Sequence, residues 1–409
     1  MNNSLKPYLR FKEFDDSWRE IQLGDIGSFK NGLNKGAEDF GFGVPFINLL
    51  DVFGKTEIDN PELKLVNASL RDIATYTVKK GDVFFIRSSV KRSGVGETVV
   101  ARRDLENTVY SGFLIRYRAT EQLNNNFKKY CFWTEGFRLL LVRFSTSSAN
   151  TNINQESLSQ LKLFIPKVDE QQKIADFLTV VDSKICQLTE KHRLLKEYKK
   201  GVMHQLFSQK IRFKDDDGKA FPDWNEDRLD SFIQRVNDPV DVEQTKKYRQ
   251  IGIRCHGKGL FHKDKVTGAE LGNKRVFWVH TKALIINIVF AWERAVAVTS
   301  ESENGFVASH RFPMFVPIEG KSDLDYLLYF FLSPRGEYLL NLASPGGAGR
   351  NKTLGQAEFA RLKLNLPSLA EQLKIAQFLQ SIDKKVDAVA LQIEQTKLFK
   401  KGLLQQMFV

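Results

Sequence analysis

The chain has 409 residues, of which 42% are hydrophobic and 27% charged, as expected of a folded, soluble protein with two or three domains. The N-terminus is polar, and the longest apolar run, at residues 283–291, falls short of the roughly 18 residues of a membrane span. These features predict a cytoplasmic protein without a signal peptide. The net charge of +12 indicates a polyanionic partner such as nucleic acid, although many soluble proteins are basic without one. The cysteines are far apart, which predicts reduced thiols and neither a disulfide framework nor a metal site (Cys131, Cys186, Cys255).

The first part of the chain predicts a mixed domain of strands and helices. Runs rich in Val, Ile, Phe and Tyr, separated by turn-forming residues, predict strands at residues 44–50, 82–86, 98–101 and 109–117. A helix is expected at residues 126–143, and a polar loop of small residues follows at 145–154. We expect a twisted, mostly antiparallel sheet with one or two helices.

A long segment at residues 161–207 returns without a gap at residues 362–408. In both copies apolar residues step by three and four, which predicts a coiled-coil seam and a helix of roughly 60 Å. The step fails only at His192 and Lys199 in the first copy, and at Thr396 and Lys400 in the second. Each helix is expected to pair with its duplicate in an antiparallel coiled coil. The alternative is that the two helices pack separately on two domains.

The segment between the repeats predicts a second α+β domain, opened by a charged turn at residues 213–218. Strands are expected at residues 248–253, 275–279, 284–289, 295–298 and 312–316, followed by a helix at 323–342 and a polar loop at 344–353. Trp224 echoes Trp18, so the duplication extends beyond the helices. The chain is therefore predicted as domain, long helix, domain, long helix, with boundaries at 1–160, 161–210, 211–361 and 362–409.

Motifs for catalysis are largely missing. Asn237-Asp-Pro-Val240 lacks the second proline and the aromatic residue with which amino-methyltransferases grip a flipped base. The glycine-rich stretch at residues 346–353 carries Asn351 where a phosphate-binding loop requires glycine. Cys255, His256 and His262 are conceivable metal ligands without a fourth, so a polar loop that meets phosphates or base edges is favoured. An enzyme acting alone is not expected.

The motif Leu-Pro-x-x-x-Glu-Gln-x-x-Ile-Ala-x-Phe-Leu opens both long helices, at residues 165–178 with Ile for the first Leu, and at 366–379. With Lys80-Gly-Asp-Val83, Trp292-Glu-Arg-Ala295 and Gly305-Phe-Val-Ala-Ser309, nearly the whole chain resembles the specificity (S) subunit of a type I restriction–modification system. The second domain departs from this pattern, because it reads Thr281-Lys-Ala283 where a Gly-Asp pair is expected.

This resemblance implies a subunit without catalytic residues or a cofactor of its own. It implies two target-recognition domains, each reading one half of a bipartite sequence in double-stranded DNA, held apart by the paired helices. Two methyltransferase (M) subunits would dock on the helices and bring S-adenosylmethionine, and restriction (R) subunits would bring ATP and Mg-dependent cleavage. The alternative is a coiled-coil protein-interaction adaptor without specific DNA binding.

Polar and basic loops supply the predicted DNA-binding residues, each with an ordinary solvated side chain as its alternative. They are Asn31, Lys35, Lys91, Arg92, Ser93, Asn150 and Asn152 in the first domain, and Arg254, His256, Lys258, Lys274, Arg275, Arg350, Asn351 and Lys352 in the second. The repeated pairs Glu170-Gln171 and Glu371-Gln372 begin the two helices, where a carboxylate suits the helix dipole. We assign these four residues, as a hypothesis, to docking of the methyltransferase.

Overall fold

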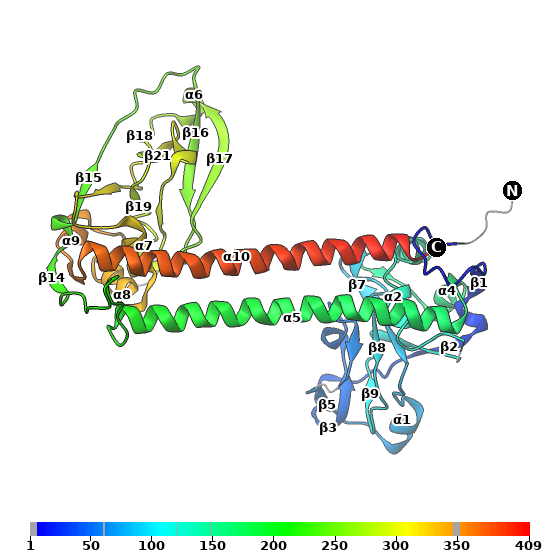
Figure 1. Ribbon diagram of the computed structural model, residues 1–409. Coiled ribbons are helices and arrows are strands. Elements are labelled where there is room, and N and C mark those ends of the chain that lie inside the picture. The colour runs from blue at the N-terminus through cyan, green and yellow to red at the C-terminus, as the bar shows by residue number, and fades with distance from the viewer. Residues whose placement is uncertain (1–5, 60–61, 121, 148, 347–351) are drawn as a thin grey trace. The chain divides into compact units, whose positions relative to one another are not determined.

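The computed structural model describes residues 6–59, 62–120, 122–147, 149–346 and 352–409. The chain forms two compact units, the first made of Met1–Thr189 with Leu391–Val409 and the second of Glu190–Ala390. The long helices α5 (Val168–Phe207) and α10 (Leu369–Gln406) each contribute residues to both units (Figure 1).

The first unit is built on a five-stranded sheet with the order β2-β10-β6-β8-β4. Its strands are antiparallel except for the parallel pair of β4 and β8, and they span β2 (Gly27–Asn31), β4 (Glu57–Ile58), β6 (Val83–Ile86), β8 (Thr98–Ala101) and β10 (Leu114–Ala119). Two three-stranded sheets adjoin it, formed by β5 (Lys64–Val66), β3 (Phe40–Ile47) and β9 (Val109–Tyr110), and by β11 (Thr146–Ser147), β12 (Thr151–Asn152) and β7 (Ser88–Ser89).

Strand β6 shows why the five-stranded sheet lies in the interior of the first unit. All four of its side chains are buried, and they alternate between two apolar clusters. Val83 and Phe85 pack with the helices, while Phe84 and Ile86 pack on the opposite face. A strand covered on both faces reads as a continuous apolar run, as this one does. The short helices described for this unit are α1 (Leu70–Thr75), α2 (Lys128–Cys131), α3 (Glu135–Arg143) and α4 (Gln155–Ser159).

The second unit has two four-stranded sheets. The first is formed in the order β15 (Ile233–Val236), β22 (Met314–Pro317), β19 (Leu284–Ile286) and β20 (Val296–Val298). The second is formed in the order β17 (Leu260–Thr267), β16 (Lys247–Ile253), β21 (Val307–Ser309) and β18 (Val276–Trp278), and only its β16–β21 pair is parallel among the strand pairs described in this unit. Its short helices are α6 (Gly268–Leu271), α7 (Leu324–Leu332), α8 (Pro334–Leu342) and α9 (Gln356–Ala360). The α+β prediction is confirmed.

The two long helices pair antiparallel within each unit. In the first unit Ile174 and Leu178, near the start of α5, share an apolar core with Leu403 and Met407, near the end of α10. In the second unit the end of α5 packs with the start of α10, as Val202 and Leu206 meet Ile375 and Leu379. The predicted antiparallel coiled coil is confirmed, and its apolar seam continues into the core of each unit.

The lysines that interrupt the apolar seam are paired across it. Lys199 Nζ donates to both carboxylate oxygens of Asp383, at 2.5 and 2.7 Å, in the second unit. At the equivalent positions in the first unit, Lys400 Nζ lies 2.6 Å from Asp182 Oδ1. Tyr329 and Tyr130 donate hydroxyl protons to the same two aspartates, at 2.6 and 3.0 Å. A polar residue at a seam position selects register and orientation, so these pairs specify the antiparallel alignment.

Several elements differ from the sequence prediction for local reasons. The helix expected at 323–342 divides at Ser333, because the proline that follows disfavours helical backbone there and Ser333 instead caps α8. The helix expected at 126–143 also divides, at Thr134, whose side chain accepts a hydrogen bond from the Phe137 N–H and caps α3. The strand expected at 109–117 is split between two sheets. Residues 260–263 belong to the polar loop predicted around Cys255, His256 and His262, but they open β17, because Gly257 and Gly259 adopt positive φ and complete a tight turn before them.

Candidate nucleic-acid interface

In the first unit the structure brings several predicted residues together around β7. Strand β12 pairs with β7, placing Asn152 opposite Ser88, and Asn150 precedes this strand. Lys91, Arg92 and Ser93 form the exposed turn that follows β7. Arg138 of α3 fixes this turn, because its guanidinium donates to the carbonyl oxygens of Ser93, Val95 and Gly96 at 2.6 to 2.8 Å. The predicted basic turn and asparagine loop therefore form one polar surface.

Asn31 and Lys35 lie on other elements. Asn31 ends β2, where it pairs with Ile115 of β10 and is half-buried. Lys35 Nζ lies 3.4 Å from Asp72, so its charge is already paired inside the unit. Neither residue lies on β7, on β12 or on the turn that follows β7.

A second basic feature of the first unit is a hollow of about 410 Å³ beside the Lys80-Gly81-Asp82 segment. Asp82 is buried and accepts two hydrogen bonds from Arg118, at 2.6 and 2.7 Å. Lys128 is also buried, and it donates to the Gly81 carbonyl oxygen at 2.9 Å and to Asn125 Oδ1 at 2.7 Å. Burial lowers the pKa of the Lys128 ammonium to about 8. Sequence reasoning noticed this segment but not the cations that surround it.

In the second unit Arg254, His256 and Lys258 are exposed on the turn between β16 and β17. The His256 backbone has a φ of 60°, and its N–H donates to the Glu293 carbonyl oxygen at 2.7 Å, which fixes the turn against the body of the unit. The Arg254 guanidinium lies 5.0 Å from the ring centre of Phe261 and donates to the Leu260 carbonyl oxygen at 2.7 Å.

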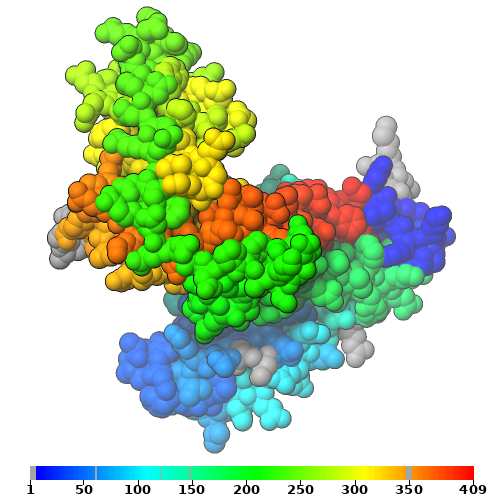
Figure 2. All heavy atoms as spheres, turned by 60° about the vertical axis from the view of Figure 1, so that its left-hand side comes forward, coloured from blue at the N-terminus to red at the C-terminus, as the bar shows by residue number. Residues whose placement is uncertain are grey.

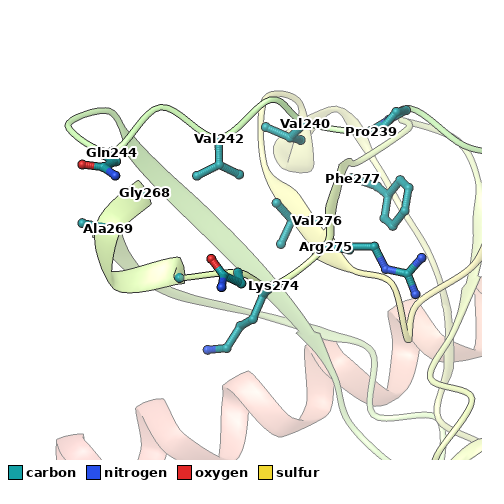
Figure 3. Close-up of a pocket in the computed structure, with 12 residues that line it drawn as sticks. Pro239, Val240, Val242, Gln244, Gly268, Ala269, Lys274, Arg275, Val276 and Phe277 are labelled. Carbon is teal, nitrogen blue, oxygen red and sulfur yellow. The ribbon is translucent and has the colours of Figure 1, made fainter.

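Lys274 and Arg275 lie on the segment that leads into β18, and both are exposed. They line a hollow of about 590 Å³ between this segment, α6 and residues 239–244 (Figure 3). Lys274 also lines a second hollow of about 390 Å³ on the same sheet, together with Lys263, His310 and Arg311. This second hollow has no acidic lining residue, and its lysines and arginine form no ion pair within the described chain. We call this second hollow, with its side chains Lys263, Lys274, His310 and Arg311, the basic hollow.

Sequence reasoning missed His310 and Arg311 and included Lys263 only as the end of the polar loop at residues 255–263, because these residues lie on or beside separate strands that only the sheet order brings together. Lys263 belongs to the edge strand β17, and His310 and Arg311 follow β21. Arg254, His256 and Lys258 do not line the basic hollow.

Lys352 begins the last described loop before α9 and points back onto its own unit. Its ammonium lies 5.7 Å from the ring centre of Trp292 and 3.4 Å from Asn341 Oδ1. Arg350 and Asn351, predicted beside it, lie outside the described residues.

The structure contradicts direct docking through Glu170, Gln171, Glu371 and Gln372, because all four side chains are buried. A partner subunit cannot reach a carboxylate that is already enclosed. These residues instead fasten each long helix to the unit in which it begins.

The fastening is the same in both units. Arg10 donates two hydrogen bonds to Glu170, both of 2.7 Å, and Trp18 Nε1 donates to the same carboxylate at 3.3 Å. In the second unit Arg212 donates to Glu371 at 3.1 and 2.8 Å, and Trp224 Nε1 donates at 3.2 Å. We call each set the arginine–glutamate–tryptophan clamp.

The adjoining glutamines complete the attachment. Gln171 donates to the carbonyl oxygens of Gln122 and Pro166, both at 3.0 Å, and accepts from the Asn124 N–H at 2.8 Å. Gln372 makes the matching bonds to Lys321, Pro367 and Asp323. The repeated Glu-Gln pair is therefore explained by helix attachment.

Within the described residues, no helix is long and apolar enough to cross a membrane. The same part of the chain holds no group of three or more His, Cys, Asp or Glu side chains placed to bind a metal.

Comparison with known proteins gives concordant matches. A family model described as the type I restriction modification DNA specificity domain matches residues 15–196 and 263–396. The chain is 24% identical over 414 residues to a putative type I restriction enzyme MjaX specificity subunit of Methanocaldococcus jannaschii, covering 96% of this chain and 93% of that protein. The MjaVIII specificity subunit of the same organism is 19% identical over 420 residues, covering 95% and 91%. In fold, the chain is similar to the crystal structure of a type I restriction-modification S subunit from M. genitalium, with a TM-score of 0.54, 12% identity and 99% of each chain covered.

Proposed function

The chain belongs to the type I restriction–modification DNA specificity family, and from this premise we propose that it is the DNA-reading subunit of a type I restriction–modification complex. In this role it reads a bipartite target in double-stranded DNA with two target-recognition domains, residues 1–160 and 211–361. The long helices, residues 161–210 and 362–409, join the readers and carry the partner subunits. We place the complex in the cytoplasm, with its DNA.

The observation that carries this proposal is a duplicated scaffold with unlike exposed loops. Both units fasten a long helix with the same arginine–glutamate–tryptophan clamp. The polar surfaces that each unit presents are different: the first has the Lys91–Ser93 turn beside Asn150 and Asn152, and the second has the basic hollow. One scaffold with two different surfaces suits a target made of two different half-sites.

We propose that the cations supply the affinity and the neighbouring polar side chains the sequence preference. Lysines and arginines that neutralise phosphates release condensed counterions, which makes binding strongly dependent on salt. Base edges are read by a few directed hydrogen bonds, each good bidentate pair contributing about 1–3 kcal/mol of discrimination. In the first unit Lys91 and Arg92 neutralise phosphates, and Asn152 reads a base edge. Lys263 and Lys274 take the phosphate contacts in the second unit, and Arg254, His256, Lys258 and Arg275 add further contacts from that unit.

In this proposal the chain itself is not catalytic. Methyl transfer from S-adenosylmethionine belongs to two methyltransferase subunits, and ATP-dependent cleavage with Mg²⁺ belongs to restriction subunits. The chain recognises the target sequence in the DNA and provides the surface on which these subunits assemble.

The test is methyl transfer from labelled S-adenosylmethionine to DNA, measured with the chain alone, with the methyltransferase subunit alone and with both. We expect transfer only in the mixture, at one split sequence that methylome sequencing identifies. Transfer by the chain alone would make it an enzyme in its own right. A mixture that forms a complex but shows no sequence preference would favour an adaptor without DNA specificity.

A further inference from the structure

A buried lysine lines the hollow of about 410 Å³ in the first unit. Lys128 is 2% exposed, and its ammonium donates hydrogen bonds to two neutral oxygens, those of Gly81 and Asn125. An ammonium has three protons to donate, and among the described residues the third meets no acceptor. Asp82, the carboxylate of this hollow, is already occupied by two hydrogen bonds from Arg118. A charge that is buried without its own counter-charge destabilises a fold, so this lysine calls for an explanation.

The second unit has a leucine where the first unit has this lysine. Tyr130 and Tyr329 donate to the equivalent aspartates of the helix seam, which aligns the two units at this point. Counting back two positions from each tyrosine places Lys128 opposite Leu327. Leu327 is fully buried in the apolar core of the second unit. An apolar residue therefore satisfies the scaffold at this position, and the lysine serves a purpose other than packing.

The hollow around Lys128 is strongly basic. Its described lining holds four cationic side chains and one carboxylate, which leaves a formal charge of +3. The cations are Lys79, Lys80, Arg118 and Lys128. Lys79 and Lys80 are exposed, and neither forms an ion pair within the part of the chain that the structure describes. Val168, the first residue of α5, also lines the hollow, so the positive end of that helix dipole adds to the same wall.

Three segments of the first unit meet at this hollow. They are the turn before β6, the residues between β10 and α2, and the start of α5. In Figure 2 the start of α5, drawn in sea green, lies against the first unit, and its apolar side chains share the core of that unit. Gly81 adopts a φ of 83°, which favours glycine, and its carbonyl oxygen accepts from Lys128. The turn and Asn125 therefore hold the lysine in position.

The donors that remain at the hollow are ammonium groups, and they suit a phosphate group. The Arg118 guanidinium is paired with Asp82, which leaves Lys79, Lys80 and the third N–H of Lys128. A terminal phosphate carries a charge of about −1.5 to −2 at pH 7 and three acceptor oxygens, so it can meet several ammonium groups at once. A carboxylate carries only one charge and two oxygens.

The size and depth of the hollow favour a small ligand over a nucleic acid. Its volume of about 410 Å³ lies within the range of roughly 300–1,000 Å³ that is typical of small-molecule sites. Each phosphodiester of a DNA duplex carries a single charge and lies on the outside of a wide helix. A group held there does not reach a side chain that is 2% exposed, as Lys128 is.

We propose that this hollow binds a small anion with a terminal phosphate group, free phosphate or a phosphate monoester, and that Lys128 is its central ligand. Lys79 and Lys80 contact the same phosphate from the exposed side. The anion supplies the counter-charge that Lys128 lacks. The site belongs to the first unit alone, because Leu327 takes the place of the lysine in the second. It does not depend on the proposed function, since Lys91–Ser93, Asn150 and Asn152 do not line it.

The test is isothermal titration calorimetry of the full chain with inorganic phosphate and, separately, with AMP, in chloride buffer of constant ionic strength. We expect one saturable site per chain, and the probe that binds more tightly identifies free phosphate or a monoester. Lys128→Leu, which introduces the residue of the second unit, weakens binding by at least about tenfold, because it removes a charged donor. The matched control is Lys200→Leu, an exposed lysine of α5, which leaves the affinity unchanged.

Saturable binding of neither probe would overturn the proposal, and so would a folded Lys128→Leu variant that binds as the wild type does. A second variant decides the matter if Lys128→Leu fails to fold. Lys79→Gln with Lys80→Gln alters two exposed side chains, so Tm changes by about 2 °C or less while the affinity for the phosphate probe falls at least about threefold. Unchanged affinity in this double variant would contradict the placement of the phosphate.

Duplex DNA is the remaining arm of the test. The proposal expects Lys128→Leu to leave DNA binding by the assembled complex unchanged. If neither phosphate nor AMP binds, and this variant weakens DNA binding instead, the hollow is part of the DNA surface and the small-anion site is wrong.

Discussion

Replacing Glu371 by glutamine tests whether the arginine–glutamate–tryptophan clamp holds a long helix in place. The wild-type carboxylate is fully buried and accepts two hydrogen bonds from Arg212 and one from Trp224. Glutamine keeps the shape and one acceptor oxygen, but its NH₂ group must face a donor, and the arginine loses its buried counter-charge and keeps only the exposed Asp223 carboxylate, 3.4 Å away. Hydrogen bonds to charged groups contribute about 1.5–3 kcal/mol each. Arg212 is partly solvent-accessible and recovers some hydration in the variant, so we expect a net loss of about 2–3 kcal/mol.

The assay is calorimetric unfolding of the full chain. For a unit of this size a change of 1 kcal/mol shifts Tm by roughly 2–4 °C, so the variant unfolds roughly 4–12 °C lower. The matched control is Glu394→Gln, which breaks the exposed 2.9 Å pair with Lys397 and changes Tm by about 1 °C or less. Glu170→Gln is expected to produce the same loss in the first unit. A Glu371 variant that unfolds with its control would show that the clamp does not stabilise the helix attachment.

Three further predictions follow from other contacts. Replacing Asp383 by Lys places two lysines opposite each other across the seam and lowers Tm. The compensating change of Lys199 to Asp restores most of the lost Tm. A double variant whose Tm is no higher than that of the single variant would show that this pair does not determine the register. Burial alone raises the pKa of the Glu303 carboxyl, but hydrogen bonds from two serines and a histidine outweigh it and lower the pKa to about 2. A depressed pKa gives stability that is present above the unfolded value and is lost as pH falls from about 4.5 toward 2. The wild type should therefore lose this component of stability on acid titration, whereas Glu303→Gln, which has no carboxyl to protonate, should show no such component; equal pH dependence in the two proteins would refute this role. Replacing Lys263 and Lys274 by glutamine weakens DNA binding by the assembled complex and lowers the slope of log K against log salt by about 1.8, whereas an unchanged slope would mean that the basic hollow meets no phosphate.

The repeat was predicted in detail because its signal is local and written twice. Apolar residues at a three-four step give a seam whatever lies around it, and the structure confirms that seam in both units. Even the interruptions are visible in the sequence, because Lys199 and Lys400 break the three-four step. Their partners Asp383 and Asp182 were not identified, because an ion pair across a coiled coil depends on alignment between helices rather than on spacing within one.

The Glu-Gln pair that opens each helix shows the limit of reasoning from a motif. Its repetition was recognised, but its role was assigned to the surface. A residue at the start of an amphipathic helix faces either solvent or the domain, and the sequence does not say which. Arg10 and Arg212, which decide the matter by reaching the two glutamates, lie 160 and 159 positions away in the chain.

The candidate DNA surfaces were predicted in part. Loops such as Lys91–Ser93 were identified because polar residues after a strand have little reason to be buried, and they are exposed. The basic hollow was not identified as a whole. The sequence predicts Lys274, but it predicts a loop where Lys263 lies on strand β17. The order of strands that brings the two lysines together depends on long-range pairing.

The sequence by itself determined the architecture: a duplicated chain of two α+β domains and two long helices whose apolar seams pack against each other. Periodicity and repetition depend only on the order of residues along the chain, so they can be recognised without knowledge of the fold. The tertiary structure alone decided which charges are enclosed and which remain available. Glu170 and Glu371 became internal anchors, while Tyr198 and Phe399 stayed in water, because burial is set by what packs against a residue and not by the residue itself.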